Sequence, residues 1–150
     1  MPELSVGGVL ARPTRVRDRL VTARPDETVR DASRRMAEHN CGSVLVVGGD
    51  GALVGIFTER DLLVRVVALG RDPAATPVAE VMTREPETIG VEAPVRDAVR
   101  RMDEGAFRHM PVVEGGRVVG VISARDVPVL ELGRMAEELD SRHRLAERLW

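Results

Sequence analysis

The chain has 150 residues and a formal net charge of −2, in which 22 arginines and no lysine stand against 24 acidic residues. This length suits one domain with a substantial core, and the nearly balanced charge argues against a protein drawn as a whole to nucleic acid or anionic lipid. Aromatic residues make up only 2% of the chain, so few platforms exist for stacking single-stranded bases. With one cysteine, no secretory signal pattern and no run of 18 apolar residues, we expect a soluble cytoplasmic protein.

The first half of the chain predicts an ordered series of elements, because helical spacing of apolar residues alternates with short apolar runs and glycine-rich turns. In chain order these are a lead-in (6–13), an insertion (14–20), an extended segment (21–23), a helix (29–39), a strand (43–47), a hairpin turn (48–51), a strand (52–57) and a helix (59–69).

The second half repeats this order after a linker at 71–77. The expected elements are a lead-in (78–84), an extended segment (87–89), a helix (95–104), a strand (110–113), a turn (114–116), a strand (118–122) and a further helix. The C-terminal segment 128–150 carries apolar residues at helical spacing, and we expect this helix to pack on its own domain or on a second copy.

An internal repeat relates the two halves. Residues 29–39 and 95–105 are identical at 8 of 11 positions, and 54–62 resemble 119–127. Each copy is too small to bury its apolar face alone, so the repeat predicts one compact body of two β-α-β-β-α units with a pseudo-twofold axis. A ligand is expected between the copies.

Both copies contain the pattern Gly-x-x-Ser/Thr-x-x-Asp where a strand meets a helix, at 55–61 and 120–126. A hydroxyl followed three residues later by a carboxylate is typical of a capping box, which needs no ligand. Helix N-terminal amides beside a hydroxyl also suit phosphate, a carboxylate one turn later suits ribose hydroxyls, and the glycine lets a bound group approach closely. The residues alone leave capping and nucleotide binding both open.

The whole pattern resembles a tandem pair of cystathionine β-synthase (CBS) domains, the Bateman module, over about residues 6–127. The resemblance rests on 25–32, on 108–113 and on both Gly-x-x-Ser/Thr-x-x-Asp segments. It implies an α/β fold of the α+β type, in which two pseudo-symmetric CBS repeats pack through their sheets. We assign 1–70 to the first repeat with its lead-in, 71–127 to the linker and second repeat, and 128–150 to the C-terminal helix.

The resemblance also implies site residues, since the family binds adenosine-containing ligands between the repeats. The implied phosphate and ribose contacts are Thr58 with Asp61 and Ser123 with Asp126, and the implied base pockets are Thr22, Ala23, Ser43 and Val44 in one cleft and Thr88, Ile89, His109 and Met110 in the other. Arg108 and His109 match positions that reach phosphates, while Arg60 and Arg125 either clamp phosphate or are solvated. The two copies differ at 42–45 and 108–111, so we expect inequivalent sites, and the insertion 14–20 could cover one of them.

The resulting hypothesis is a regulatory module that binds AMP, ADP or ATP, with NAD or S-adenosylmethionine as further possibilities, and requires no cofactor. We expect a disc-shaped homodimer through the CBS modules and the terminal helix, acting on an unidentified target protein. The alternatives are a ligand-free dimerisation module and, below it, a nucleotide-hydrolysing enzyme, which lacks a recognisable general base and metal carboxylate pair. His39 and Cys41 lack companions for a zinc site, and His143 is expected to face solvent.

Overall fold

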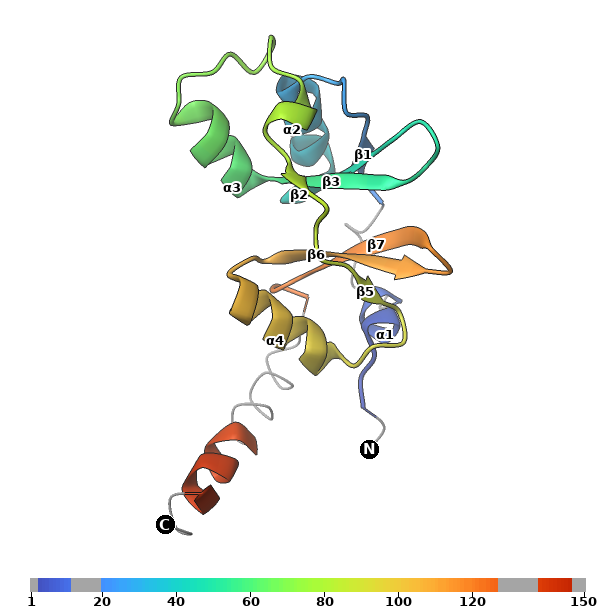
Figure 1. Ribbon diagram of the computed structural model, residues 1–150, viewed down its shortest axis with the longest axis vertical. Helices are drawn as coiled ribbons and strands as arrows, with labels where there is room; N and C mark the ends of the chain where they lie inside the picture. The colour runs from blue at the N-terminus through green and yellow to red at the C-terminus, as the bar shows by residue number, and fades with distance from the viewer. Residues whose placement is uncertain (1–2, 12–19, 127–137, 147–150) are drawn as a thin grey trace.

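A computed structural model, which describes residues 3–11, 20–126 and 138–146, shows two stacked α/β halves (Figure 1). The upper half in Figure 1 contains a four-stranded sheet of order β1-β2-β3-β4, and the lower half contains a three-stranded sheet of order β5-β6-β7. The sheets lie toward each other and the helices lie outside (Figure 1). The expected fold class, two α/β units packed through their sheets, is confirmed.

The bounds of the elements agree closely with the expected ones. In chain order they are α1 (Val6–Leu10), β1 (Thr22–Ala23), α2 (Val29–His39), β2 (Ser43–Val47), β3 (Leu53–Thr58), α3 (Glu59–Asp61), η1 (Leu62–Val67), η2 (Val78–Glu80), β4 (Thr83–Arg84), β5 (Ile89–Gly90), α4 (Val95–Gly105), β6 (His109–Glu114) and β7 (Arg117–Ser123). Residues 124–126 form a turn after β7, and the rest of the helix expected there lies outside the described residues.

Each half follows the same strand pairing. In the first half, β2 runs parallel to β1 and antiparallel to β3, and in the second half β6 does the same with β5 and β7. The helix between the parallel strands buries one face against its sheet, through Val29, Ala32 and Met36 in α2. Each half therefore has its own apolar core, whereas the repeated sequence predicted copies too small to bury their apolar faces alone.

The segment after β3 differs from the expected α-helix. One α-helical turn, α3, continues into the π-helix η1, in which the Ala68 amide donates to the Leu63 carbonyl at 2.9 Å. This wider turn buries Val66 in the first core and leaves Val64 and Val67 exposed on the outer side. The helical conformation was predicted correctly, and its π-helical hydrogen bonding was not.

The two lead-ins are exchanged between the halves. Helix α1 lies beside β5 and α4 in the lower half of Figure 1, and its Val6 amide donates to the Ala93 carbonyl at 2.8 Å. In the same way the Val78 amide of η2 donates to the Glu27 carbonyl of the first half at 2.8 Å. The proposed division at 1–70 and 71–127 follows chain order, whereas the packing joins each lead-in to the other repeat.

The motif glycines make this exchange possible. A methyl group added at Gly55 would lie 2.4 Å from Met82 Sδ, and one added at Gly120 would lie 3.2 Å from Leu10 Cδ1. The close approach expected at these glycines is therefore real, but the group that approaches is a lead-in side chain. A close approach of a bound ligand to the backbone of these glycines stays a prediction.

The described part of the C-terminal segment, 138–146, is helical and exposed throughout. Leu139 and Leu145 are each 59% exposed, so this part does not pack on its own domain, and packing on a second copy stays a prediction. His143 is exposed, as expected. Among the residues described, no helix combines the length and apolar character needed to cross a membrane.

Candidate functional site

The hydroxyl motifs and the starts of the middle strands lie together in each half. Thr58, at the end of β3, pairs with Ser43 at the start of β2, and Ser123, at the end of β7, pairs with His109 at the start of β6. The strand pairing thus brings together, within each repeat, a hydroxyl motif and a segment predicted to line a base pocket. Thr22 lies on the neighbouring strand β1, opposite Leu45.

The carboxylates of both motifs bind their own strand ends. Thr58 Oγ1 accepts from the Asp61 amide at 3.2 Å, and Asp61 Oδ2 accepts from the Thr58 amide at 3.0 Å, which is a complete capping box. In the second repeat, Asp126 Oδ2 accepts from the Ser123 amide at 2.6 Å. The capping interpretation is confirmed at Thr58, and the ligand role of these residues remains a prediction.

Most of the expected base-pocket side chains lie in the two cores. Ala23 and Val44 are 3% and 0% exposed in the first core, and Ile89 and Met110 are 4% and 0% exposed in the second. Ser43 is also buried. Contacts from these positions to a ligand would therefore come chiefly from their backbone groups.

The two repeats meet where β2 and β6 begin. A methyl group added at Gly42 would lie 3.0 Å from His109 Nε2 and 3.2 Å from Glu59 Oε1. The imidazole of the second repeat and the carboxylate of the first therefore share the space that Gly42 leaves open. Glu59 was not among the predicted site residues. The signal in the sequence was a difference of charge between the copies, because Glu59 aligns with the uncharged Ala124.

Burial lowers the pKa of His109 below its usual range, because the charged imidazolium would lose hydration. The carboxylates of Glu59 and Asp126 act in the opposite direction, and Arg108 and Arg125 lower the pKa further. His109 is therefore neutral at pH 7. The three expected phosphate contacts Arg60, Arg108 and Arg125 are exposed.

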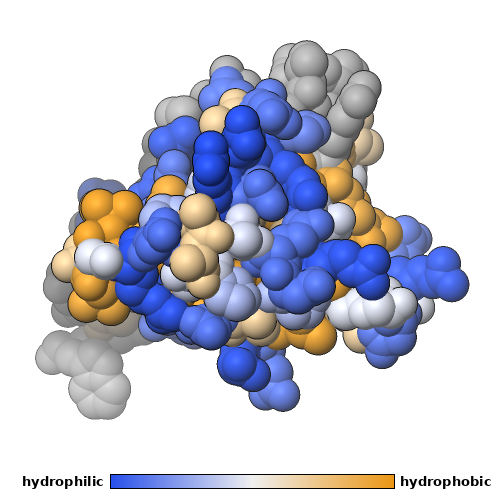
Figure 2. All heavy atoms as spheres, turned by 90° about the horizontal axis from the view of Figure 1, so that it is seen from above, coloured by the Kyte–Doolittle hydropathy of each residue, from blue (hydrophilic) through white to orange (hydrophobic). Residues whose placement is uncertain are grey.

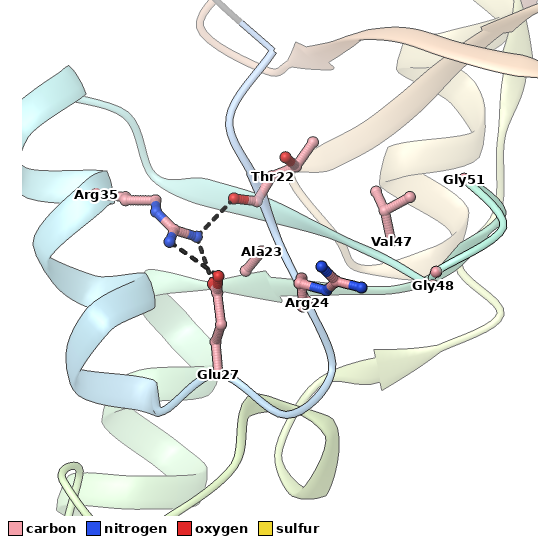
Figure 3. A pocket seen from close by; sticks show the side chains of 9 residues that line it. Thr22, Ala23, Arg24, Glu27, Arg35, Val47, Gly48 and Gly51 are labelled. Carbon is pink, nitrogen blue, oxygen red and sulfur yellow. Dashed lines mark hydrogen bonds and ion pairs between the residues drawn. The ribbon is translucent and has the colours of Figure 1, made fainter.

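A separate open cavity of about 520 Å³ lies beside β1 and the β2–β3 hairpin (Figure 3). It includes Thr22 and Ala23 but neither hydroxyl motif. Within it, Arg35 donates to the Thr22 carbonyl at 2.9 Å and forms a two-pronged ion pair with Glu27. This cavity is thus part of the first repeat, whereas the predicted clefts lie between the repeats.

The repeated helix sequence contained the signal for this arrangement. In the second repeat Arg101, at the position of Arg35, donates to the Thr88 carbonyl at 3.0 Å. Each arginine therefore ties its helix to the first strand of its own repeat. The sequence identity of α2 and α4 therefore includes the arginine that makes this hydrogen bond as well as the buried apolar residues.

A metal centre finds no support in the described part of the chain, where no group of three or more His, Cys, Asp and Glu residues could hold an ion. Cys41 is half-buried and packs against the first core.

A CBS domain family model matches residues 13–68 and 78–127, which are the two repeats. The chain belongs to the CBS domain family. Among curated relatives, a CBS domain-containing protein of Arabidopsis thaliana, CBSCBSPB2, is 39% identical over 102 residues, or 68% of this chain. The match spans only 19% of that relative's length.

Solved structures of CBS proteins share the fold. The CBS domain protein PAE2072 from Pyrobaculum aerophilum, solved with AMP, is 27% identical with a TM-score of 0.77, over 89% of this chain and 99% of that chain. The CBS domain pair of protein MJ0100, solved with 5′-methylthioadenosine and S-adenosyl-L-methionine, is 27% identical with a TM-score of 0.74 over the same shares. The overall arrangement of this CBS pair is therefore that of adenosyl-binding members of the family.

Proposed function

We propose that this CBS pair is a regulatory module that binds AMP, ADP, ATP or a related adenosyl ligand in the clefts between its repeats. The observation that carries the proposal is the agreement of fold with the AMP complex over 89% of the chain. The structure solved with two adenosyl ligands supports the same class of ligand. The module would act by a change of shape or assembly on a target protein, rather than by catalysis.

In the proposed binding mode, Thr58 and Ser123 bind phosphate and Asp61 and Asp126 bind ribose hydroxyls. An ionised carboxylate has about four acceptor positions, so one bond to a strand-end amide is compatible with further bonds to a ribose diol. The capping bonds also hold the carboxylates in place before the ligand arrives. The adenine would lie against the backbone of the first strand and the start of the second strand of each repeat.

Calorimetry and thermal unfolding with AMP, ADP, ATP, NAD and S-adenosylmethionine test this proposal. A ligand at 100 times its Kd should stabilise the folded state by about 2.7 kcal/mol. Asp126→Ala should abolish binding in its cleft and lower the unliganded stability by only about 1 kcal/mol, the usual value of a lost cap. Asp31→Ala is the matched control, because Asp31 is an exposed carboxylate in the first turn of α2, outside the motifs.

The capping bonds favour a second candidate, a ligand-free dimerisation module. Its expectation is that no adenosyl ligand produces heat or raises the melting temperature of the wild-type chain. That result would refute ligand binding and leave the motifs with a purely structural role. Steady release of phosphate from ATP would instead support the hydrolytic alternative.

We also propose that the chain forms a homodimer through the outer face of η1 and the residues that follow it. Leu63, Val64, Val67 and Leu69 are 52–69% exposed. Figure 2 shows hydrophobic side chains gathered at the left edge of the molecule, the side on which α3 and η1 lie in Figure 1. A contiguous apolar patch of this kind is typical of an interaction surface.

Sedimentation velocity of Val64→Glu and Val67→Glu tests the dimer. Both variants should sediment as monomers with unchanged circular dichroism, because each places a charge in the proposed contact. Val119→Glu, at an exposed position of β7, is the control and should sediment like the wild type. A monomeric wild-type chain would refute the dimer without affecting the ligand proposal.

A further inference from the structure

The two proposed clefts differ in charge at equivalent positions. The Glu59 amide donates to the Gly42 carbonyl at 3.0 Å, and the Ala124 amide donates to the Arg108 carbonyl at 3.0 Å. These matching bonds show that Glu59 corresponds to Ala124 and Gly42 to Arg108 in space as well as in sequence. The first repeat therefore has a carboxylate where the second has a methyl group, and lacks the guanidinium that the second has.

The Glu59 carboxylate lies at the contact between the repeats. The contacts at Gly42 place Glu59 Oε1 and His109 Nε2 around the same small space, and a larger residue at position 42 would fill it. Glu59 also directly follows Thr58, the residue proposed to bind phosphate. A negative charge thus stands next to one proposed phosphate position and has no counterpart next to the other.

The charged groups around His109 do not remove this difference. Glu59 faces His109 from the first repeat, and Asp126, Arg108 and Arg125 face it from the second. Because burial keeps the imidazole neutral at pH 7, His109 adds no positive charge to compensate Glu59.

We propose that Glu59 is a specificity-determining residue, which makes the Thr58–Asp61 cleft favour adenosyl ligands with at most one phosphate and leaves polyphosphates to the Ser123–Asp126 cleft. The inference rests on the proposed adenosyl function and adds the class of ligand for each cleft. Its physical basis is the repulsion at close range between the exposed Glu59 carboxylate and a phosphate bound beside it.

The test is calorimetric titration with adenosine, AMP and ATP in the Asp126→Ala background, where the Thr58–Asp61 cleft is the one left to bind. Adding Glu59→Ala, which reproduces the residue of the second repeat, should strengthen ATP binding about tenfold and leave adenosine binding unchanged. Glu59→Gln should act in the same direction while keeping the size of the side chain. Glu92→Gln, at an exposed carboxylate between β5 and α4, is the charge-matched control and should change neither affinity.

The reciprocal variant, Ala124→Glu in the Asp61→Ala background, should weaken ATP binding about tenfold relative to adenosine. An unchanged ratio of ATP to adenosine affinity in the Glu59 variants would overturn the inference while leaving the adenosyl function intact. Equal strengthening of all three ligands would overturn it as well, because a charge effect must scale with phosphate. Absence of any adenosyl binding by the wild-type chain would overturn both proposals.

Discussion

Replacing Arg35 with alanine should lower the free energy of unfolding by about 2 kcal/mol at pH 7. Arg35 donates to the Thr22 carbonyl at 2.9 Å and to Glu27 Oε1 at 2.9 Å, and the Arg35 and Glu27 side chains are 35% and 24% exposed. Each contact is worth about 1 kcal/mol after solvent screening. In a chain of this size the melting temperature should fall by about 4–8 °C.

This loss should depend on pH with a definite sign. The hydrogen bond from Arg35 lowers the pKa of Glu27 in the folded state. A lowered folded-state pKa stabilises the protein above the unfolded-state value of about 4.3, and this contribution disappears as the pH falls through the folded-state value. The difference between the wild type and Arg35→Ala should therefore shrink between pH 7 and pH 3.

Urea unfolding followed by circular dichroism at both pH values measures the effect. Arg101→Ala is the internal control, because Arg101 makes the equivalent carbonyl bond at 3.0 Å but a longer contact, 3.2 Å, to the more exposed Glu87. Its expected cost is about half as large. An Arg35→Ala protein as stable as the wild type, or an equal loss at pH 7 and pH 3, would refute the assignment.

Gly55→Val should lower the free energy of unfolding by about 1–3 kcal/mol in a urea titration, since even a methyl group there would lie 2.4 Å from Met82 Sδ. An unchanged free energy of unfolding would contradict the packing of the lead-in on β3. Burial lowers the pKa of His109, so the stability of the wild type should fall as the pH drops below about 6.5, and His109→Gln should remove this fall. Melting temperatures of both proteins from pH 8 to pH 5 measure the effect. The same pH dependence in the wild type and the variant would contradict it. Ser33→Ala should stabilise the chain by about 1 kcal/mol, since the Ser33 hydroxyl is buried without a hydrogen-bond partner in the described structure; a lower melting temperature would disprove this.

Local patterns predicted the elements well. Helices α2 and α4 begin at Val29 and Val95 as expected, and β2, β3, β6 and β7 agree within one residue at each end. Helical spacing, apolar runs and glycine turns act over a few residues, so one sequence is enough to recognise them. The π-helical bonding of η1 was not predicted, because it depends on which side chains the core accepts.

The site was predicted only in part. The sequence placed Thr58 and Asp61 at a strand end and indicated a capping box, which the structure confirms. The contact of Glu59 and His109 with Gly42 joins residues far apart in the chain, so no local pattern could indicate it. The sequence shows only that arginine occupies equivalent positions, 35 and 101, in the two copies. The structure shows that each donates a hydrogen bond to a backbone carbonyl, of Thr22 and of Thr88.

The sequence by itself determined that two copies of one unit exist and in which order their strands and helices follow, because apolar periodicity is a local property. Only the tertiary structure decided that each lead-in packs on the other repeat, since 6–13 and 78–84 resemble each other and their sequences do not indicate which core each one joins. The tertiary structure also decided which charges meet between the repeats, because that depends on how two separately formed sheets pack.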